Sequence, residues 1–160
     1  MIPLLLLLFA AADPGGYLAA KWGMTPDEVL ATLPQATRHA GPDATKPFRG
    51  ALTAIIIKEI TVAEVPMQVN FRFGETSGRL EEVYLQPLKN EHKDLFYFNR
   101  IEALLVQKYG RAWTSTDPTV QVSQWITPST VIRLTYSPPR LIPLRSLTIE
   151  YRPRVSSPPI

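Results

Sequence analysis

Side chains able to do acid–base or metal chemistry are few in this chain of 160 residues, and they lie far apart. It has two histidines, His39 and His92, and no cysteine. No spacing joins either histidine to a nucleophile or to a set of metal ligands. The lack of cysteine excludes disulfides, thiolate metal sites and cysteine nucleophiles. We therefore expect no metal, no cofactor and no catalytic activity.

The acid pair Glu81–Glu82 lies in a segment with the alternation of a β-strand. Neighbouring strand residues point to opposite faces, so these two carboxylates cannot flank one bond as those of a glycosidase do. We interpret the pair as a solvated strand edge. The Gly-rich turn at residues 74–78 lacks the Gly-Lys-Ser/Thr ending of a phosphate-binding loop. A hydrolase remains an alternative, but without a recognisable site.

The residue types typical of binding surfaces form a more coherent group. Trp125 alternates with Gln121, Ser123 and Thr127, which predicts that its side chain lies on a polar, open face of a sheet. The alternative is that Trp125 faces the core. Trp, Tyr and Arg are the residues that dominate binding hot spots. We expect four more of these types to share the open face with Trp125 as binding residues: Arg72, Tyr84, Arg133 and Arg152.

The elements that must position these residues begin with a helix. Thr25 can cap it, Pro26 suits its first position and Glu28 completes a capping box. Pro34 ends this helix after about two turns. Three strands are predicted to follow, at residues 52–62, 67–73 and 80–85. In the second of them, four apolar residues should face the core: Met67, Val69, Phe71 and Phe73.

The same order of elements returns in the second half. Asn90 can cap a helix that Gly110 ends, and Phe98, Ile101 and Leu105 lie at helical spacing within it. Three more strands are predicted at residues 120–127, 130–136 and 146–152. The predicted fold is therefore α+β, with duplicated αβββ units at about residues 21–88 and 89–152. The units form one two-layer domain, with two helices on one face of an antiparallel sheet and the other face open.

Several short motifs in this layout resemble those of small exported bacterial proteins of uncharacterised function. In those proteins a Trp-Gly-Met-Ser/Thr motif, here residues 22–25, starts the first helix. A Lys-Tyr-Gly motif, here residues 108–110, ends a later one. The layout is also loosely similar to the β-lactamase inhibitor protein and to the small outer-membrane assembly lipoprotein, both binding proteins. The resemblance implies a fold, export and binding, and it implies no catalytic residue.

The first twelve residues are an apolar run closed by Ala10-Ala-Ala12, the pattern of a secretory signal peptide cleaved before Asp13. The alternative is a buried N-terminal strand or helix. The run is shorter than the ~20 residues that span a bilayer, so we expect no transmembrane anchor. Residues 13–152 would then form the single domain, and residues 153–160 a disordered tail.

The formal net charge is +3, and the basic excess lies near the C-terminus. Residues 118–160 carry five arginines and one acid, which is too little for a nucleic-acid binder. We predict a non-catalytic, periplasmic or secreted module that binds another envelope or secreted protein through its open sheet face. The alternatives are an inhibitor of an exported enzyme, acting through a loop at residues 137–143, and a polyanion-binding protein.

Overall fold

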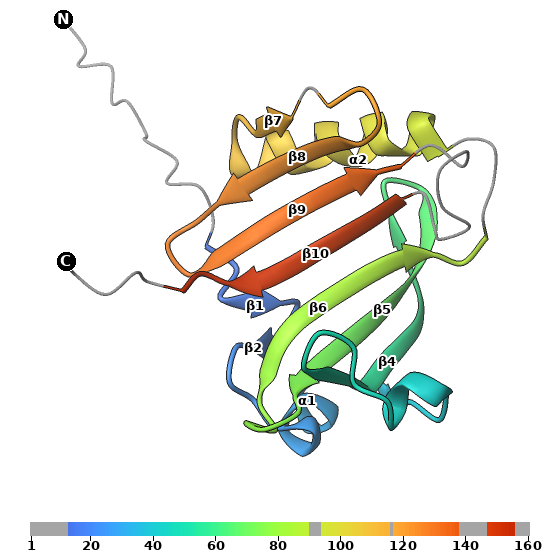
Figure 1. Cartoon of the computed structure of the whole chain (residues 1–160), viewed down its shortest axis with the longest axis vertical. Helices are drawn as coiled ribbons and strands as arrows, with labels where there is room; N and C mark the ends of the chain where they lie inside the picture. Colours follow the sequence, from blue (N-terminus) through green and yellow to red (C-terminus); the bar gives the residue numbers. More distant parts are fainter. Residues whose placement is uncertain (1–12, 90–93, 116, 138–146, 156–160) are drawn as a thin grey trace, which may run out of the picture.

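Alternating apolar residues organise the chain around one large antiparallel sheet (Figure 1). The structure is a computed structural model that describes residues 13–89, 94–115, 117–137 and 147–155. The predicted signal segment, Asn90, His92 and all but the first residue of the predicted wedge at residues 137–143 lie outside these ranges. Among the described residues, eight strands pair in the spatial order β3 (Thr37–Arg38), β4 (Ala51–Val62), β5 (Val65–Gly74), β6 (Leu80–Pro87), β10 (Leu147–Pro153), β9 (Thr130–Tyr136), β8 (Gln121–Ile126) and β7 (Trp113–Ser115).

Two α-helices complete the mixed α+β fold, α1 (Pro26–Thr32) and α2 (Asp94–Tyr109). The predicted capping box of α1 is present: the Thr25 hydroxyl accepts from the Glu28 amide, and the Glu28 carboxylate accepts from the Thr25 amide. Gly110, at φ 85°, follows α2, and its amide donates to Val106. The start of α1 and the end of α2 are therefore each specified by the residues at that position. None of the helices among the described residues is long and apolar enough to cross a membrane.

The core lies between the helices and one face of the sheet. Met67, Val69, Phe71 and Phe73 are all buried in it, as the alternation predicts. The same hydrophobic cluster contains buried residues of both helices, among them Val29, Phe98, Ile101 and Leu105. In Figure 1, α2 runs behind β8 and β9, and α1 lies at the lower end of the sheet.

The strand count differs from the prediction, because each helix is followed by four strands. The additional strands, β3 and β7, have two and three residues and form the two edges of the sheet. A register shift interrupts the pairing of β4 with β5 between Ile57 and Ile60. A further shift lies between Thr53 and Ile55.

The two sets of four strands meet where β6 pairs with β10 at the centre of the sheet. A short N-terminal hairpin, β1 (Gly16–Tyr17) and β2 (Ala20–Lys21), packs beneath this junction. Directly after this hairpin in the chain, the Trp22 indole donates to the Thr130 hydroxyl at 2.9 Å. The Gly23 amide donates to the Leu80 carbonyl at 3.1 Å. Trp22 is therefore a packing residue that ties the start of β9 to the start of β6.

Candidate functional site

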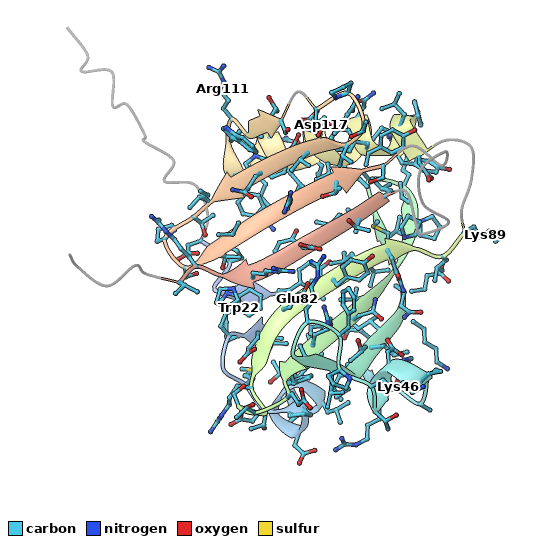
Figure 2. The ribbon with its side chains drawn as sticks, in the orientation of Figure 1. Trp22, Lys46, Glu82, Lys89, Arg111 and Asp117 are labelled. Carbon is cyan, nitrogen blue, oxygen red and sulfur yellow. The ribbon has the colours of Figure 1, made fainter. Side chains whose placement is uncertain are left out.

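The face of the sheet opposite the helices carries mainly polar side chains. Residues paired directly across strands lie on the same side of a sheet, so the register identifies which side chains stand together. One row crosses all eight strands: Thr37, Ile56, Asn70, Tyr84, Glu150, Arg133, Gln124 and Trp113. We call this side the open face, because neither α-helix packs against it. The 3₁₀ turn at Pro42–Ala44 and the segment after it lie at its β4 end, where Ile56 and Asn70 are buried. Figure 2 views the sheet from this side, with Glu82 over the junction of β6 and β10.

Four of the five predicted binding residues stand on the open face, in this row or the adjacent one: Arg72, Tyr84, Arg133 and Arg152. These four side chains differ in how far they are exposed to a partner. Arg72 is buried and fully engaged in ion pairing, whereas Arg133 is exposed between Gln124 and Glu150. Arg152 is partly exposed and pairs with two carboxylates. The alternation of residues in the sequence therefore predicted which four side chains share this face. It did not predict which of them are used in the structure of the face and which are exposed to a partner.

The fifth predicted residue, Trp125, is in the core, and its placement on the open face is wrong. It is opposite Ile132, only 2% of its surface is exposed, and its indole donates to the Gly110 carbonyl at 2.8 Å. The open face was predicted because Trp125 alternates in the sequence with three polar residues, Gln121, Ser123 and Thr127. One of them, Ser123, points toward α2, where its hydroxyl donates to the Glu102 carboxylate. A polar residue on this strand can therefore face a helix and not solvent, as Ser123 does.

The exposed tryptophan of the open face is Trp113, which sequence reasoning missed. Its side chain is in the row through its pairing with Gln124, and 63% of its surface is exposed. It belongs to β7, a strand of three residues, in which no alternation can be recognised. Its indole offers a partner a large apolar surface with a polar N–H at its edge.

A buried ionic network lies under the centre of the open face. Arg72 and Glu82 pair at 2.6 Å with less than a tenth of each side chain exposed. Arg152 pairs with Glu82 at 3.1 Å and with Glu150 at 3.5 Å. The interpretation of Glu81–Glu82 as a solvated edge therefore holds for exposed Glu81 and is wrong for Glu82. Glu82 is on the open face by alternation with Tyr84 and pairs with Arg72, whereas a register shift between Arg72 and Phe73 leaves Glu81 out of the pairing.

Arg72 also fixes a tight turn before β4. Phe48 and Ala51 exchange two backbone hydrogen bonds of 2.9 and 3.2 Å, and the two residues between them have positive φ, 52° at Arg49 and 74° at Gly50. Arg72 donates to the carbonyl oxygens of both Phe48 and Ala51. The turn is therefore of the type that usually requires Asn-Gly. Arg49 holds a left-handed conformation that costs about 1–2 kcal/mol for most residues.

The turn carries a second exposed aromatic side chain at the edge of the open face. The Phe48 ring is 61% exposed, and two guanidinium groups stand over it, that of Arg72 at 5.3 Å and that of Arg49 at 5.2 Å from the ring centroid. The Arg72 guanidinium is buried, whereas Arg49 is exposed at the tip of the turn. Phe48 is thus held in place from below by the ionic network.

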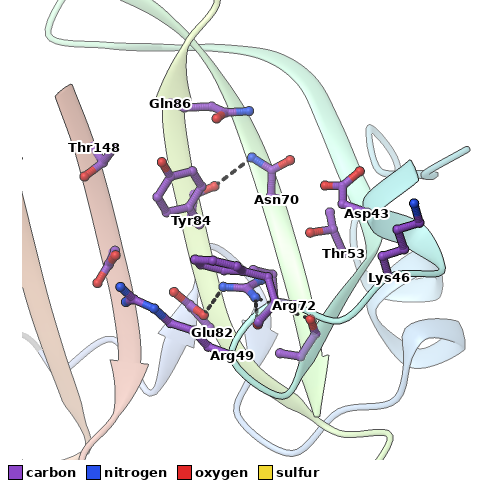
Figure 3. A pocket seen from close by; sticks show the side chains of 13 residues that line it. Asp43, Lys46, Arg49, Thr53, Asn70, Arg72, Glu82, Tyr84, Gln86 and Thr148 are labelled. Carbon is purple, nitrogen blue, oxygen red and sulfur yellow. Dashed lines mark hydrogen bonds and ion pairs between the residues drawn. The ribbon is translucent and has the colours of Figure 1, made fainter. Parts of the chain in front are cut away.

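A pocket of about 540 Å³ opens between this turn and the central strands (Figure 3). Its floor is polar and internally bonded: the Asn70 amide donates to the Tyr84 carbonyl at 3.1 Å and accepts from Gln68 at 2.8 Å. Its lining comes from the 3₁₀ turn η1 (Pro42–Ala44), the segment after it, and β4, β5, β6 and β10: Asp43, Lys46, Phe48, Arg49, Ala51, Thr53, Asn70, Arg72, Glu82, Tyr84, Gln86, Thr148 and Glu150.

The histidine and the acids near this pocket serve its structure. His39 Nε2 bonds to the Asp43 carboxylate at the pocket wall. Burial would raise the pKa of Asp43, but the hydrogen bonds from His39, from its own backbone and from Thr53 outweigh it and lower the pKa. Among the described residues, no group of three or more His, Asp or Glu side chains is placed to hold a metal ion.

Comparison with protein-family models, with curated protein sequences and with solved structures gave no match. The assignment of function to this face therefore rests on its geometry and its chemistry.

Proposed function

We propose that the protein is a non-catalytic binding module whose open face receives another protein. The observation that carries this proposal is the pair of exposed aromatic side chains, Phe48 and Trp113, on one uncovered face of the sheet. Large aromatic residues in water offer apolar area that a partner can desolvate, and they are enriched in the centres of binding surfaces. Arg133 lies between them on the face and supplies an exposed charge.

The rigidity of the face supports the same proposal. Glu82 is already paired with Arg72 and Arg152, and Asn70 is bonded within the floor of the pocket. Side chains that are fixed before a partner arrives lose little conformational entropy on binding. A partner can therefore cover the Arg72–Glu82 pair without separating it from its counter-ion. The face resembles a preformed interface more than a merely solvated surface.

The arrangement of the sheet supports a two-lobed binding surface. Each helix is followed by an antiparallel set of four strands, and the two sets join through their last strands, β6 and β10. We propose that the two halves are duplicated units in two layers, with both helices behind the sheet. Each unit then contributes one exposed aromatic side chain to the open face, Phe48 from the first and Trp113 from the second.

We also propose that the protein acts after export, as a periplasmic or secreted protein. The apolar run at residues 1–12 and the small residues that close it support this location. Asp13 supports it as well, because its carboxylate accepts hydrogen bonds from Thr127 and Ser129 at the turn between β8 and β9. A chain that begins at Asp13 would keep this anchor.

The proposal is tested by capture from a secreted or envelope fraction of the source cells, with wild-type and variant proteins immobilised side by side. Trp113→Ala removes an exposed aromatic side chain from the open face. Phe96→Ala is the matched control, because Phe96 is 56% exposed on α2, behind the sheet. We expect the same stoichiometric partner with the wild type and with Phe96→Ala, and at least about a tenfold lower yield with Trp113→Ala. Loss with Phe96→Ala and full recovery with Trp113→Ala would contradict the proposal.

A further inference from the structure

We infer that the pocket beside Phe48 takes a carboxylate-bearing side chain of the protein partner. This inference rests on the proposed function, and it adds the chemistry that the partner must bring.

Each acidic side chain of the pocket already has a partner. Glu82 pairs with Arg72 and Arg152, Glu150 pairs with Arg152, and Asp43 bonds to His39. Two cationic side chains of the lining, Lys46 and Arg49, have no ion pair among the described residues. The field that a ligand meets beside either of these side chains is therefore positive, and a negative group is its complement.

The position of Arg49 is maintained at a cost. Its backbone is left-handed, where Asn or Gly would be favoured, and Arg72 stabilises the turn through the carbonyls on either side of it. A guanidinium stacked on a ring keeps its N–H donors free at its edge, where they can form a bidentate bond to a carboxylate. The Arg49 guanidinium stands over the Phe48 ring in this way. Strain of this kind is concentrated at binding and catalytic sites.

The charges in the pocket are separated, which favours a peptide over a polyanion. Lys46 lies at the β4 side of the pocket, whereas the Arg49 side chain extends from the turn toward β10, the strand that carries Glu150 (Figure 3). A polysaccharide with an anion on every sugar would bring negative charge against Glu150. A peptide can place one carboxylate at Arg49 and keep a neutral or basic group beside Glu150. The volume of about 540 Å³ is within the range of pockets that take such groups.

The test uses a short blocked peptide with one glutamate among serines, and its twin with glutamine in place of the glutamate. Each is titrated into the isotope-labelled full chain, and the NMR signals of residues 46–51 are followed. We expect saturable shifts with the glutamate peptide, with a Kd of about 1 mM. We expect no saturable shift with the glutamine twin.

Two variants locate the effect. Arg49→Asn removes the guanidinium and suits the turn better than arginine does, so loss of folding cannot explain its result. Combined with Lys46→Gln, it should abolish the shifts. Arg100→Gln, on α2 behind the sheet, should leave them unchanged. Equal shifts with both peptides, no saturable shift with either, or tighter binding of heparin at the same signals would overturn the inference.

These results are separable from those of the capture experiment. If the peptides fail while Trp113→Ala still loses the captured partner, the carboxylate pocket is wrong and the open face remains the binding surface. If the peptides bind and the partner is lost only with Phe96→Ala, the proposed function is wrong.

Discussion

The indole nitrogen of Trp125, on β8, donates a hydrogen bond to the carbonyl oxygen of Gly110, the residue that ends α2. The two atoms are 2.8 Å apart. This bond fixes the side of β8 that faces the helix. The register then places Gln124 on the opposite side, next to Arg133 and Trp113. One buried contact therefore determines which tryptophan of this region is available to a partner.

The two tryptophans should respond oppositely to truncation. Trp125→Ala should lower the free energy of unfolding by about 3–5 kcal/mol, because it leaves a cavity in the core. Trp113→Ala should change it by no more than about 0.5 kcal/mol, because the residue is exposed. Denaturant unfolding followed by circular dichroism measures both. A stable Trp125→Ala protein or an unfolded Trp113→Ala protein would reverse the assignment of the two faces.

The ionic network should be more sensitive to losing one member than to losing a pair. Glu82→Gln leaves Arg72 buried without its counter-ion and should cost about 3–5 kcal/mol of unfolding free energy. In the double variant Arg72→Met, Glu82→Leu both charges are gone, and it should be more stable than Glu82→Gln. The comparison is made by denaturant unfolding at neutral pH. Equal losses in both variants would mean that the network contributes little through charge pairing.

The anchor at Asp13 predicts a pH dependence at the acid end. Hydrogen bonds, first of all from the Ser129 side chain, lower the pKa of Asp13 despite the opposing effect of desolvation. A carboxyl group whose pKa is lower in the folded state stabilises the fold above its unfolded value of about 3.9, and this stabilisation is lost as the pH falls through the folded value. Wild type should therefore be more stable than Asp13→Asn at neutral pH. Thermal unfolding should show the two proteins converging as the pH falls below about 4. A difference that stays constant into strong acid would rule out the carboxylate as its source.

Much of the fold could be predicted because long segments carry redundant patterns. Met67 to Phe73 alternates over four apolar residues, and the start of α1 is specified by three residues at fixed spacing, Thr25, Pro26 and Glu28. The edge strands β3 and β7 could not be predicted, since two or three residues show no period. Their pairing is determined by the strands already beside them.

The candidate site was predicted only in part, because its decisive contacts join distant residues. Glu82 bonds to Arg72 across ten positions of sequence and to Arg152 across seventy. No local pattern distinguishes such a carboxylate from a solvated one. Likewise, the turn at Phe48 has Arg-Gly where Asn-Gly would have been recognised, and Arg72 supplies what the local sequence lacks.

The central claim is that the open face binds the partner, and the affinity of the purified partner for Arg133→Glu tests it most directly. Arg133 is exposed in the middle of the row, so its reversal should leave folding intact while placing a carboxylate against an acidic partner. By titration calorimetry, Arg133→Glu should bind at least about tenfold more weakly than wild type, whereas Phe96→Ala on α2 should bind as wild type does. Wild-type affinity for Arg133→Glu together with weakened binding of Phe96→Ala would show that the partner contacts the helices and not the open face.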